Sequence, residues 1–275
     1  GLIAYASSLD QIGPLAGNVQ DAATVLSAIC GQDVHDNTTS ARPTEDFGRK
    51  IGESLKGKII GVPKEYFGDG LDAKCKSAID TLLKHAESEG AELREISMPN
   101  IHYAVSSYYI IATAEASSNL SRFDGVRYTY RSKEAKNLYD LYAMSRSEAF
   151  GKEVQRRIML GSYVLSSGFF DAYYVQAQKV RRLISDDFTN AFKSCDVIAS
   201  PVMPGLPLLR GTSESDPMAM YLSDIYTVSL NLAGLPGISV PCGSADGFPV
   251  NIQWIGKPYA EADLLSVAAA SEKLA

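Results

Sequence analysis

The spacing of apolar residues predicts a strand, a helix and a second strand in close succession. Residues 58–63, "KIIGVP", form a short apolar run that is typical of a buried strand. Residues 72–89 repeat apolar side chains at helical spacing, and residues 91–99, "AELREISMP", return as a strand. The apolar helical face comprises Cys75, Ala78, Ile79, Leu82, Leu83 and Ala86. Tight joints of this kind predict a parallel pair with a right-handed crossover, and therefore an α/β fold whose helices cover the sheet.

The C-terminal part shows further strand patterns. Residues 195–204 form an apolar strand that ends in a Pro-rich turn. Residues 236–243 and 248–256 resemble two adjacent strands joined by the turn "SADG", and residues 261–275 form an amphipathic helix.

Helices are predicted elsewhere along the chain. Asn18 is a good N-cap, and the apolar stripe that follows it ends before Gly31. That stripe comprises Ala22, Val25, Leu26 and Ile29. Residues 101–193 contain many helix formers and few strand signals, which predicts three or more helices. We therefore expect one domain over residues 1–275 with a mainly helical portion at about 101–193.

The first residues, "GLIAYA", form an apolar run without a polar arm or a signal-like segment. The run predicts a strand, or the approach to one, in a sheet whose other strands are partly encoded upstream.

Composition excludes several classes of function. The 275 residues carry a net charge of -6, which argues against a broad nucleic-acid-binding surface. No uncharged apolar run approaches the ~20 residues that span a bilayer. The four cysteines are far apart, so no zinc site or redox dithiol is predicted. The spacing of the three histidines suggests neither a metal site nor a catalytic triad, and no general catalytic motif is present.

Five long stretches carry more specific information: "GLIAYASSLDQIGPLAGNVQDAATVLSAICGQD", "TAEASSNLSRFDGVRY", "EVQRRIMLGSYVLSSGFFDAYYVQAQKVR", "YLSDIYTVSLNLAGLPGISVPCG" and "FPVNIQWIGKPYAEADLL". Together they resemble the amidase signature family, and within it the glutaminase subunits of tRNA-dependent amidotransferases. The resemblance runs from Gly1 to about Ala275. It implies an α/β/α sandwich with a mixed sheet, of which this chain holds the C-terminal portion, and a helical segment.

The resemblance also implies an activity. Such subunits release ammonia from free glutamine with a Ser-Ser-Lys triad, and in the family both serines and the lysine lie upstream of the "GLIA" segment. We therefore expect this sequence to keep substrate-binding positions, to lack the triad and to be inactive alone.

Three positions match the family's glutamine contacts: Tyr108, Arg157 and Asp224. Tyr109 is the main alternative to Tyr108. An arginine fork can bind the α-carboxylate of a free amino acid through two parallel hydrogen bonds, and a carboxylate such as Asp224 can bind the α-ammonium. Without a ligand role, Arg157 would be a solvated helical residue and Asp224 a helix N-cap.

Partners follow from the resemblance as well. It implies a cytoplasmic heterotrimer with amidotransferase subunits B and C, with ATP and metal ions bound by the B subunit. Glu-tRNA(Gln) would reach this chain only indirectly, and neither a cofactor nor a metal is assigned to it. Two alternatives remain: another amide hydrolase of the family, or a non-catalytic fragment that docks subunits.

Overall fold

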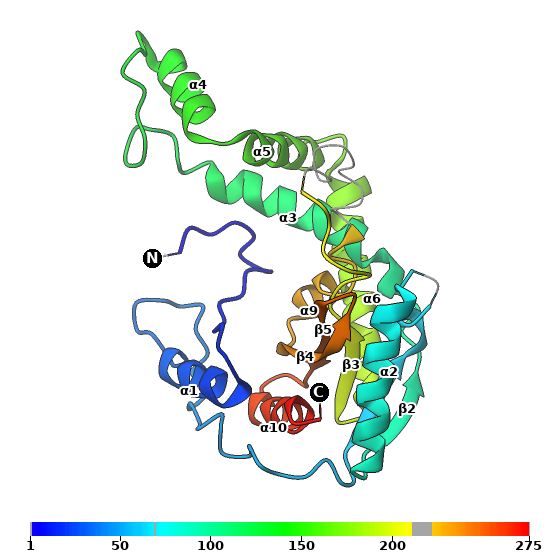
Figure 1. The fold of residues 1–275 in the computed structure, drawn as a ribbon. Coiled ribbons are helices and arrows are strands. Elements are labelled where there is room, and N and C mark those ends of the chain that lie inside the picture. The colour runs from blue at the N-terminus through cyan, green and yellow to red at the C-terminus, as the bar shows by residue number, and fades with distance from the viewer. Residues whose placement is uncertain (1, 69, 211–221, 275) are drawn as a thin grey trace. The chain divides into compact units, whose positions relative to one another are not determined.

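The computed structural model describes residues 2–68, 70–210 and 222–274, which form an α/β fold (Figure 1). None of the helices in these ranges is both long and apolar enough to cross a membrane. The strands are β1 Ile59–Pro63, β2 Glu92–Ile96, β3 Val197–Pro201, β4 Gly237–Ala245 and β5 Phe248–Ile255. The α-helices are α1 Val19–Ile29, α2 Ala73–Ser88, α3 Ala104–Leu120, α4 Leu138–Ala149, α5 Lys152–Val164, α6 Gln176–Ala191, α9 Val228–Ala233 and α10 Glu261–Glu272. Shorter helical turns are η1 Lys64–Tyr66, η2 Ile101–Tyr103 and the π-helical η3 Phe170–Val175.

The chain divides into two compact units. Unit 1 comprises Gly1–Asp10 and Ser106–Leu183, and it is helical. Unit 2 comprises Gln11–Val105 and Ile184–Ala275, and it contains the sheet. The expectation of a single domain over residues 1–275 stays a prediction.

The sheet of unit 2 has five strands in the order β2-β1-β3-β5-β4. Strand β1 pairs in parallel with both β2 and β3, whereas β5 is antiparallel to β3 and to β4. The predicted α/β class, the parallel strand–helix–strand unit and the adjacency of the last two strands are therefore confirmed.

Alternate side chains of β5 contact helices on opposite faces of the sheet. The indole nitrogen of Trp254 donates to Ser271 Oγ in α10 at 2.9 Å. The neighbouring Gln253 donates to the carbonyl of Tyr226, just before α9, at 3.1 Å. Because successive residues of a strand point to opposite faces, α10 and the turn before α9 lie on different sides of the sheet. Helix α2 contacts β4 and β5 as α10 does, and His85 on α2 is 3.2 Å from the carbonyl oxygen of Leu274.

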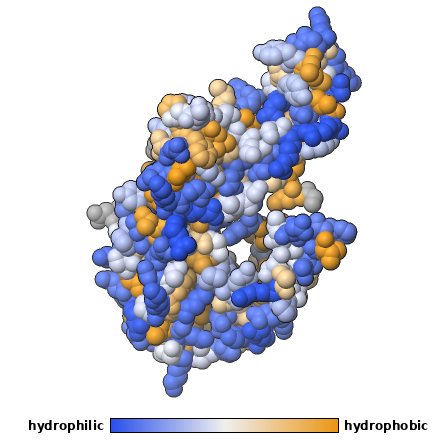
Figure 2. Space-filling model, turned by 180° about the vertical axis from the view of Figure 1, so that it is seen from behind, coloured by the Kyte–Doolittle hydropathy of each residue, from blue (hydrophilic) through white to orange (hydrophobic). Residues whose placement is uncertain are grey.

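The surface mixes polar and apolar residues. Figure 2 shows a face on which hydrophilic residues predominate and apolar residues form small groups between them. Apolar residues scattered in this way are ordinary on the surface of a folded protein. The apolar residues visible on this face therefore form no broad patch.

A buried polar cluster holds the turn that leads into α9. The hydroxyl groups of Tyr66 and Ser229 are hydrogen-bonded at 2.7 Å, and the Tyr66 ring meets Tyr226 edge-on with 5.5 Å between centroids. Tyr66 is buried, and burial raises the pKa of its phenol above its usual value, so the hydroxyl stays protonated. The turn is thereby fixed to the loop after β1 as well as to β5.

The predicted stripe of α1 is only partly correct. Asn18 is the N-cap, as predicted, and accepts from the amide of Asp21 at 2.8 Å. However, Val25 and Ile29 are exposed, and the buried residues are Val19, Ala22 and Ala23. Helix α1 packs against α10. The small side chains of Ala22 and Ala23 permit a close but narrow contact between α1 and α10. The larger side chains of Val25 and Ile29 lie outside this contact.

The described residues of "GLIAYA", which exclude Gly1, do not form a strand, so that part of the prediction is wrong, whereas an approach to a sheet partly encoded upstream stays a prediction. Residues 2–4 have no regular structure, and Leu2 and Ile3 are 67% and 60% exposed. The Asp10 carboxylate accepts from the amides of Tyr5 and Ala6, and the amides of Leu9 and Asp10 both donate to the carbonyl of Ala6. These local bonds close a turn, because they use backbone groups that a strand would need for a neighbour.

Helices α3 and α5 of unit 1 pack closely against each other. A Cβ atom at Gly161 on α5 would overlap the backbone carbonyl of Thr113 on α3. One residue further along α5, the Ser162 hydroxyl is 2.9 Å from that of Ser117. The two helices lie side by side in Figure 1. Glycine at position 161 therefore sets the distance between them.

The first prediction concerns this contact. We expect Gly161→Ala to lower the free energy of unfolding by about 1–3 kcal/mol, because backbone atoms must move to admit the new methyl group. Urea denaturation of the 275-residue chain measures the change. Gly168→Ala is the control, since a Cβ there meets nothing within 4 Å. Equal stability of the two variants would contradict the close packing of α3 on α5.

The second prediction concerns the buried cluster of unit 2. Tyr66→Phe should lower the free energy of unfolding by about 0.5–1.5 kcal/mol, because the Ser229 hydroxyl loses its partner in a buried position. The matched control is Tyr103→Phe, at a tyrosine that is 49% exposed, and we expect it to be neutral. If thermal or urea denaturation failed to separate the two variants, the hydroxyl pair would not hold the turn before α9.

Candidate functional site

Arg157 is the centre of a polar and aromatic cluster within unit 1. Its Nε donates to Glu153 Oε1, one helical turn earlier on α5, at 2.9 Å. Its Nη1 donates to the hydroxyl of Tyr5 at 2.8 Å. The guanidinium carbon lies 5.5 Å from the ring centroid of Tyr5 and 5.8 Å from that of Tyr109 on α3. Arg157 is therefore held by the N-terminal turn, α3 and α5, and is not a freely solvated helical residue.

The cluster compensates the charge of the guanidinium, whose side chain is only 22% exposed. Burial alone would lower the pKa of Arg157, but the hydrogen bonds with Glu153 and Tyr5 raise it above its ordinary value. Arg156, the neighbour along the chain, is more exposed and pairs with the other carboxylate oxygen of Glu153 at 2.9 Å. Of the two arginines, Arg157 is thus the one with a preorganised and partly desolvated charge.

Part of the hydrogen-bonding capacity of this cluster is unused. In the part of the chain that the structure describes, Arg157 Nη2 has no hydrogen-bond acceptor, and neither has the hydroxyl hydrogen of Tyr5. A guanidinium with a free edge beside a hydroxyl group suits a carboxylate or another planar anion. The arrangement can therefore bind an acidic group of a small molecule.

Of Tyr108 and its alternative Tyr109, Tyr109 is the residue with its ring beside the Arg157 guanidinium. The ring of Tyr109 lies near the guanidinium, and Tyr108 meets Tyr109 edge-on with 5.1 Å between centroids. Both residues are half-buried and engaged in interactions. The structure thus places the alternative residue, Tyr109, against the arginine, and a ligand contact of Tyr108 stays a prediction.

Asp224, the third predicted residue, is half-buried in the turn of unit 2 that precedes α9. Its carbonyl accepts from the amides of Thr227 and Val228 at 3.0 and 3.1 Å. The N-cap of α9 is Thr227, so Asp224 is not that cap. Arg157 and Asp224 belong to different units, and their joint contact with one ligand stays a prediction.

Two residues of the cluster were missed by sequence reasoning. Glu153 could have been found, because a carboxylate four positions before an arginine on a helix is a favourable pairing. Tyr5 gave no signal, since its partner is 152 positions away in the sequence.

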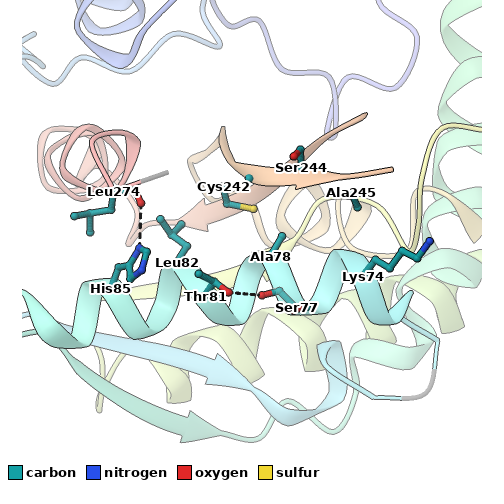
Figure 3. A pocket seen from close by; sticks show the side chains of 11 residues that line it. Lys74, Ser77, Ala78, Thr81, Leu82, His85, Cys242, Ser244, Ala245 and Leu274 are labelled. Carbon is teal, nitrogen blue, oxygen red and sulfur yellow. Dashed lines mark hydrogen bonds between the residues drawn. The ribbon is translucent and has the colours of Figure 1, made fainter. Parts of the chain in front are cut away.

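A cavity of about 540 Å³ lies between α2 and β4 in unit 2 (Figure 3). Lys74 and His85 lie at opposite ends of it, and Cys242 points in between them. Lys74 is paired with Asp246 at 2.6 Å, and burial raises the pKa of the Cys242 thiol to about 12. The cavity therefore offers no activated nucleophile at neutral pH.

The remaining thiols give no nucleophile either. Burial raises the pKa of Cys195 to about 11 and raises the pKa of Cys75, while partial desolvation and the charge of Glu261 raise the pKa of the exposed Cys30. Among the described residues, no group of three or more His, Cys, Asp or Glu side chains is arranged to hold a metal ion.

Comparison with known proteins gives a consistent result. Residues 1–265 match the amidase family. The glutamyl-tRNA(Gln) amidotransferase A subunit of Dechloromonas aromatica (strain RCB) is 54% identical over 268 residues, covering 98% of this chain and 55% of that protein. The protein of the same name from Staphylococcus aureus (strain Newman) is 52% identical, with the same coverage. The chain thus spans about half the length of these curated relatives.

Solved structures agree with this result. The crystal structure of the glutamyl-tRNA(Gln) amidotransferase A subunit from Thermotoga maritima matches with a TM-score of 0.80 and 38% identity, covering 99% of this chain and 54% of that one. A bacterial aryl acylamidase of the amidase signature family matches with a TM-score of 0.75 at 20% identity, covering 96% and 52%, which supports the fold alone. The family match and the fold together show that the chain belongs to the amidase family.

Proposed function

We propose that this chain is part of a glutaminase subunit of a tRNA-dependent amidotransferase. In this proposal the protein releases ammonia from free glutamine, and the ammonia serves to convert Glu-tRNA(Gln) to Gln-tRNA(Gln). The identity of 52–54% to amidotransferase A subunits supports the assignment. The observation that carries it is the partly buried Arg157 with its unused donors, because a carboxylate receptor suits a free amino acid.

The proposed role of these residues is to recognise the two charges of the substrate. Free glutamine carries an α-carboxylate and an α-ammonium, besides its neutral side-chain amide. Arg157 Nη1 and Nη2 would bind the carboxylate as a fork, with Glu153 and Tyr109 keeping the guanidinium in place. Asp224 would bind the ammonium, and Tyr108 would line the same site. The bond-breaking step is assigned to the family's Ser-Ser-Lys triad, for which we assign no residue in this sequence.

The wider context is part of the same proposal. We infer partner subunits of types B and C, with ATP-dependent activation of Glu-tRNA(Gln) on the B subunit, in a cytoplasmic complex. The resemblance that implies the activity supports each of these points.

A different substrate class would make different use of the site. An amide hydrolase that acts on neutral or aryl amides has no need of a charged arginine that is largely buried. Glu153 and Tyr5 already offset the burial of this guanidinium, but among the described residues its Nη2 has no acceptor, and this free edge suits an anionic partner. Glutamine is therefore a better candidate than a neutral amide.

The third prediction tests this function in the natural protein that contains the sequence. Arg157→Lys should lower kcat/KM for glutamine about 10- to 100-fold, because an ammonium cannot form the two parallel bonds of the fork and loses roughly 1.5–3 kcal/mol. Ammonia release from glutamine measures it.

Arg156→Lys is the matched control. Arg156 shares Glu153 with Arg157 but is largely exposed, so we expect its kcat/KM to stay within about twofold of wild type. Equal effects of the two substitutions would contradict a specific role for Arg157. Absence of glutaminase activity in the wild-type protein would contradict the proposed function itself.

A further inference from the structure

The N-terminal turn holds Tyr5 firmly for a residue in irregular structure. The Tyr5 amide donates to Asp10 Oδ2 at 2.9 Å, and its carbonyl accepts from Asn119 Nδ2 on α3 at 3.1 Å. Asn119 Nδ2 also donates to the hydroxyl of Ser7 at 2.9 Å, and the Asn119 side chain is buried. Both backbone groups of Tyr5 are thus fixed by side chains.

A second anchor holds the same turn at Ser8. Its amide and its hydroxyl donate to the two carboxylate oxygens of Glu115 on α3, at 2.9 and 2.5 Å. Arg181 on α6 donates to the hydroxyl and the carbonyl of Ser8, at 2.7 and 2.9 Å. The turn is therefore tied to two helices of unit 1 by charge-assisted hydrogen bonds, which are the stronger kind.

These anchors fix the turn that carries the hydroxyl group of Tyr5. This oxygen accepts a hydrogen bond from Arg157 Nη1, so its own hydrogen points elsewhere. Among the residues that the structure describes, that hydrogen has no acceptor, and Arg157 Nη2 has none either. Among the described residues, the two donors without an acceptor therefore belong to Arg157 and Tyr5, whose side chains are hydrogen-bonded to each other.

We propose that Tyr5 is a second donor to the substrate's carboxylate, beside Arg157, and that Asn119, Glu115 and Arg181 are positioning residues for it. The inference rests on the proposed function and deepens it. A neutral hydroxyl adds a hydrogen bond to the anion without adding charge. Fixing the turn before the ligand arrives reduces the ordering that binding would otherwise require.

The fourth prediction tests Tyr5 in the natural protein that contains the sequence. Tyr5→Phe keeps the ring beside the guanidinium and removes the hydroxyl, which is both the proposed donor and the acceptor of the Arg157 Nη1 hydrogen bond. We expect KM for glutamine to rise about tenfold with a smaller change in kcat, because one charge-assisted hydrogen bond to the bound substrate is lost. Tyr163→Phe, on an exposed tyrosine of α5, is the control and should leave KM within about twofold.

A second arm tests the positioning residues. Asn119→Ala should raise KM in the wild-type background, but it should add little to Tyr5→Phe, because both remove the same contact. A merely structural role would instead give additive effects. Circular dichroism and thermal unfolding would show whether Asn119→Ala is folded. If it is not, Glu115→Gln takes its place with the same expectation.

The outcomes separate the two proposals. If wild-type protein uses glutamine and Tyr5→Phe has the wild-type KM, the Tyr5 inference is overturned and the proposed function stands. If wild-type protein neither binds nor hydrolyses glutamine, both are overturned. A tenfold rise in KM that Asn119→Ala reproduces, and that does not grow further when the two substitutions are combined, supports the inference.

Discussion

The need to compensate the charge of one partly buried guanidinium explains the cluster of side chains around Arg157 in unit 1. Taking a charge out of water is unfavourable unless hydrogen bonds and an opposite charge replace the lost solvation. Glu153 and Tyr5 supply these for Arg157, and Tyr109 adds a ring beside it. Gly161 lets α5 approach α3 closely, and α3 carries Tyr109. Helix packing and site chemistry therefore depend on each other.

Sequence pattern predicted the fold well where local and tertiary preferences agree. The helix that follows β1 has the predicted buried residues Cys75, Ile79, Leu82, Leu83 and Ala86, whereas Ala78 of the same face is half-buried and lines the cavity beside β4. The "GLIAYA" run failed as a strand, since a short apolar run does not say whether a neighbour will take its backbone groups. Here the Asp10 carboxylate accepts hydrogen bonds from the backbone amides of Tyr5 and Ala6, and these bonds close a turn.

The candidate site was less predictable, because its contacts join distant segments. Arg157 and Tyr108 came from family resemblance, and spacing alone would have left Arg157 as a solvated residue. Tyr5 meets Arg157 across 152 positions, and Glu115 meets Ser8 across 107, so no local pattern could have revealed either pair. Asp224 illustrates the reverse case, since local pattern suggested an N-cap that the structure assigns to Thr227.

The central claim is that the site recognises the charges of a free amino acid, and ligand binding tests it most directly. Isothermal titration of the natural protein that contains this sequence would compare L-glutamine with two analogues, one with the α-carboxylate converted to an amide and one without the α-amino group. Loss of a charge-assisted contact of about 1.5–3 kcal/mol predicts that each analogue binds at least tenfold more weakly than glutamine. Binding of the amide analogue as tightly as glutamine would contradict the account, because the guanidinium would then have no carboxylate to hold.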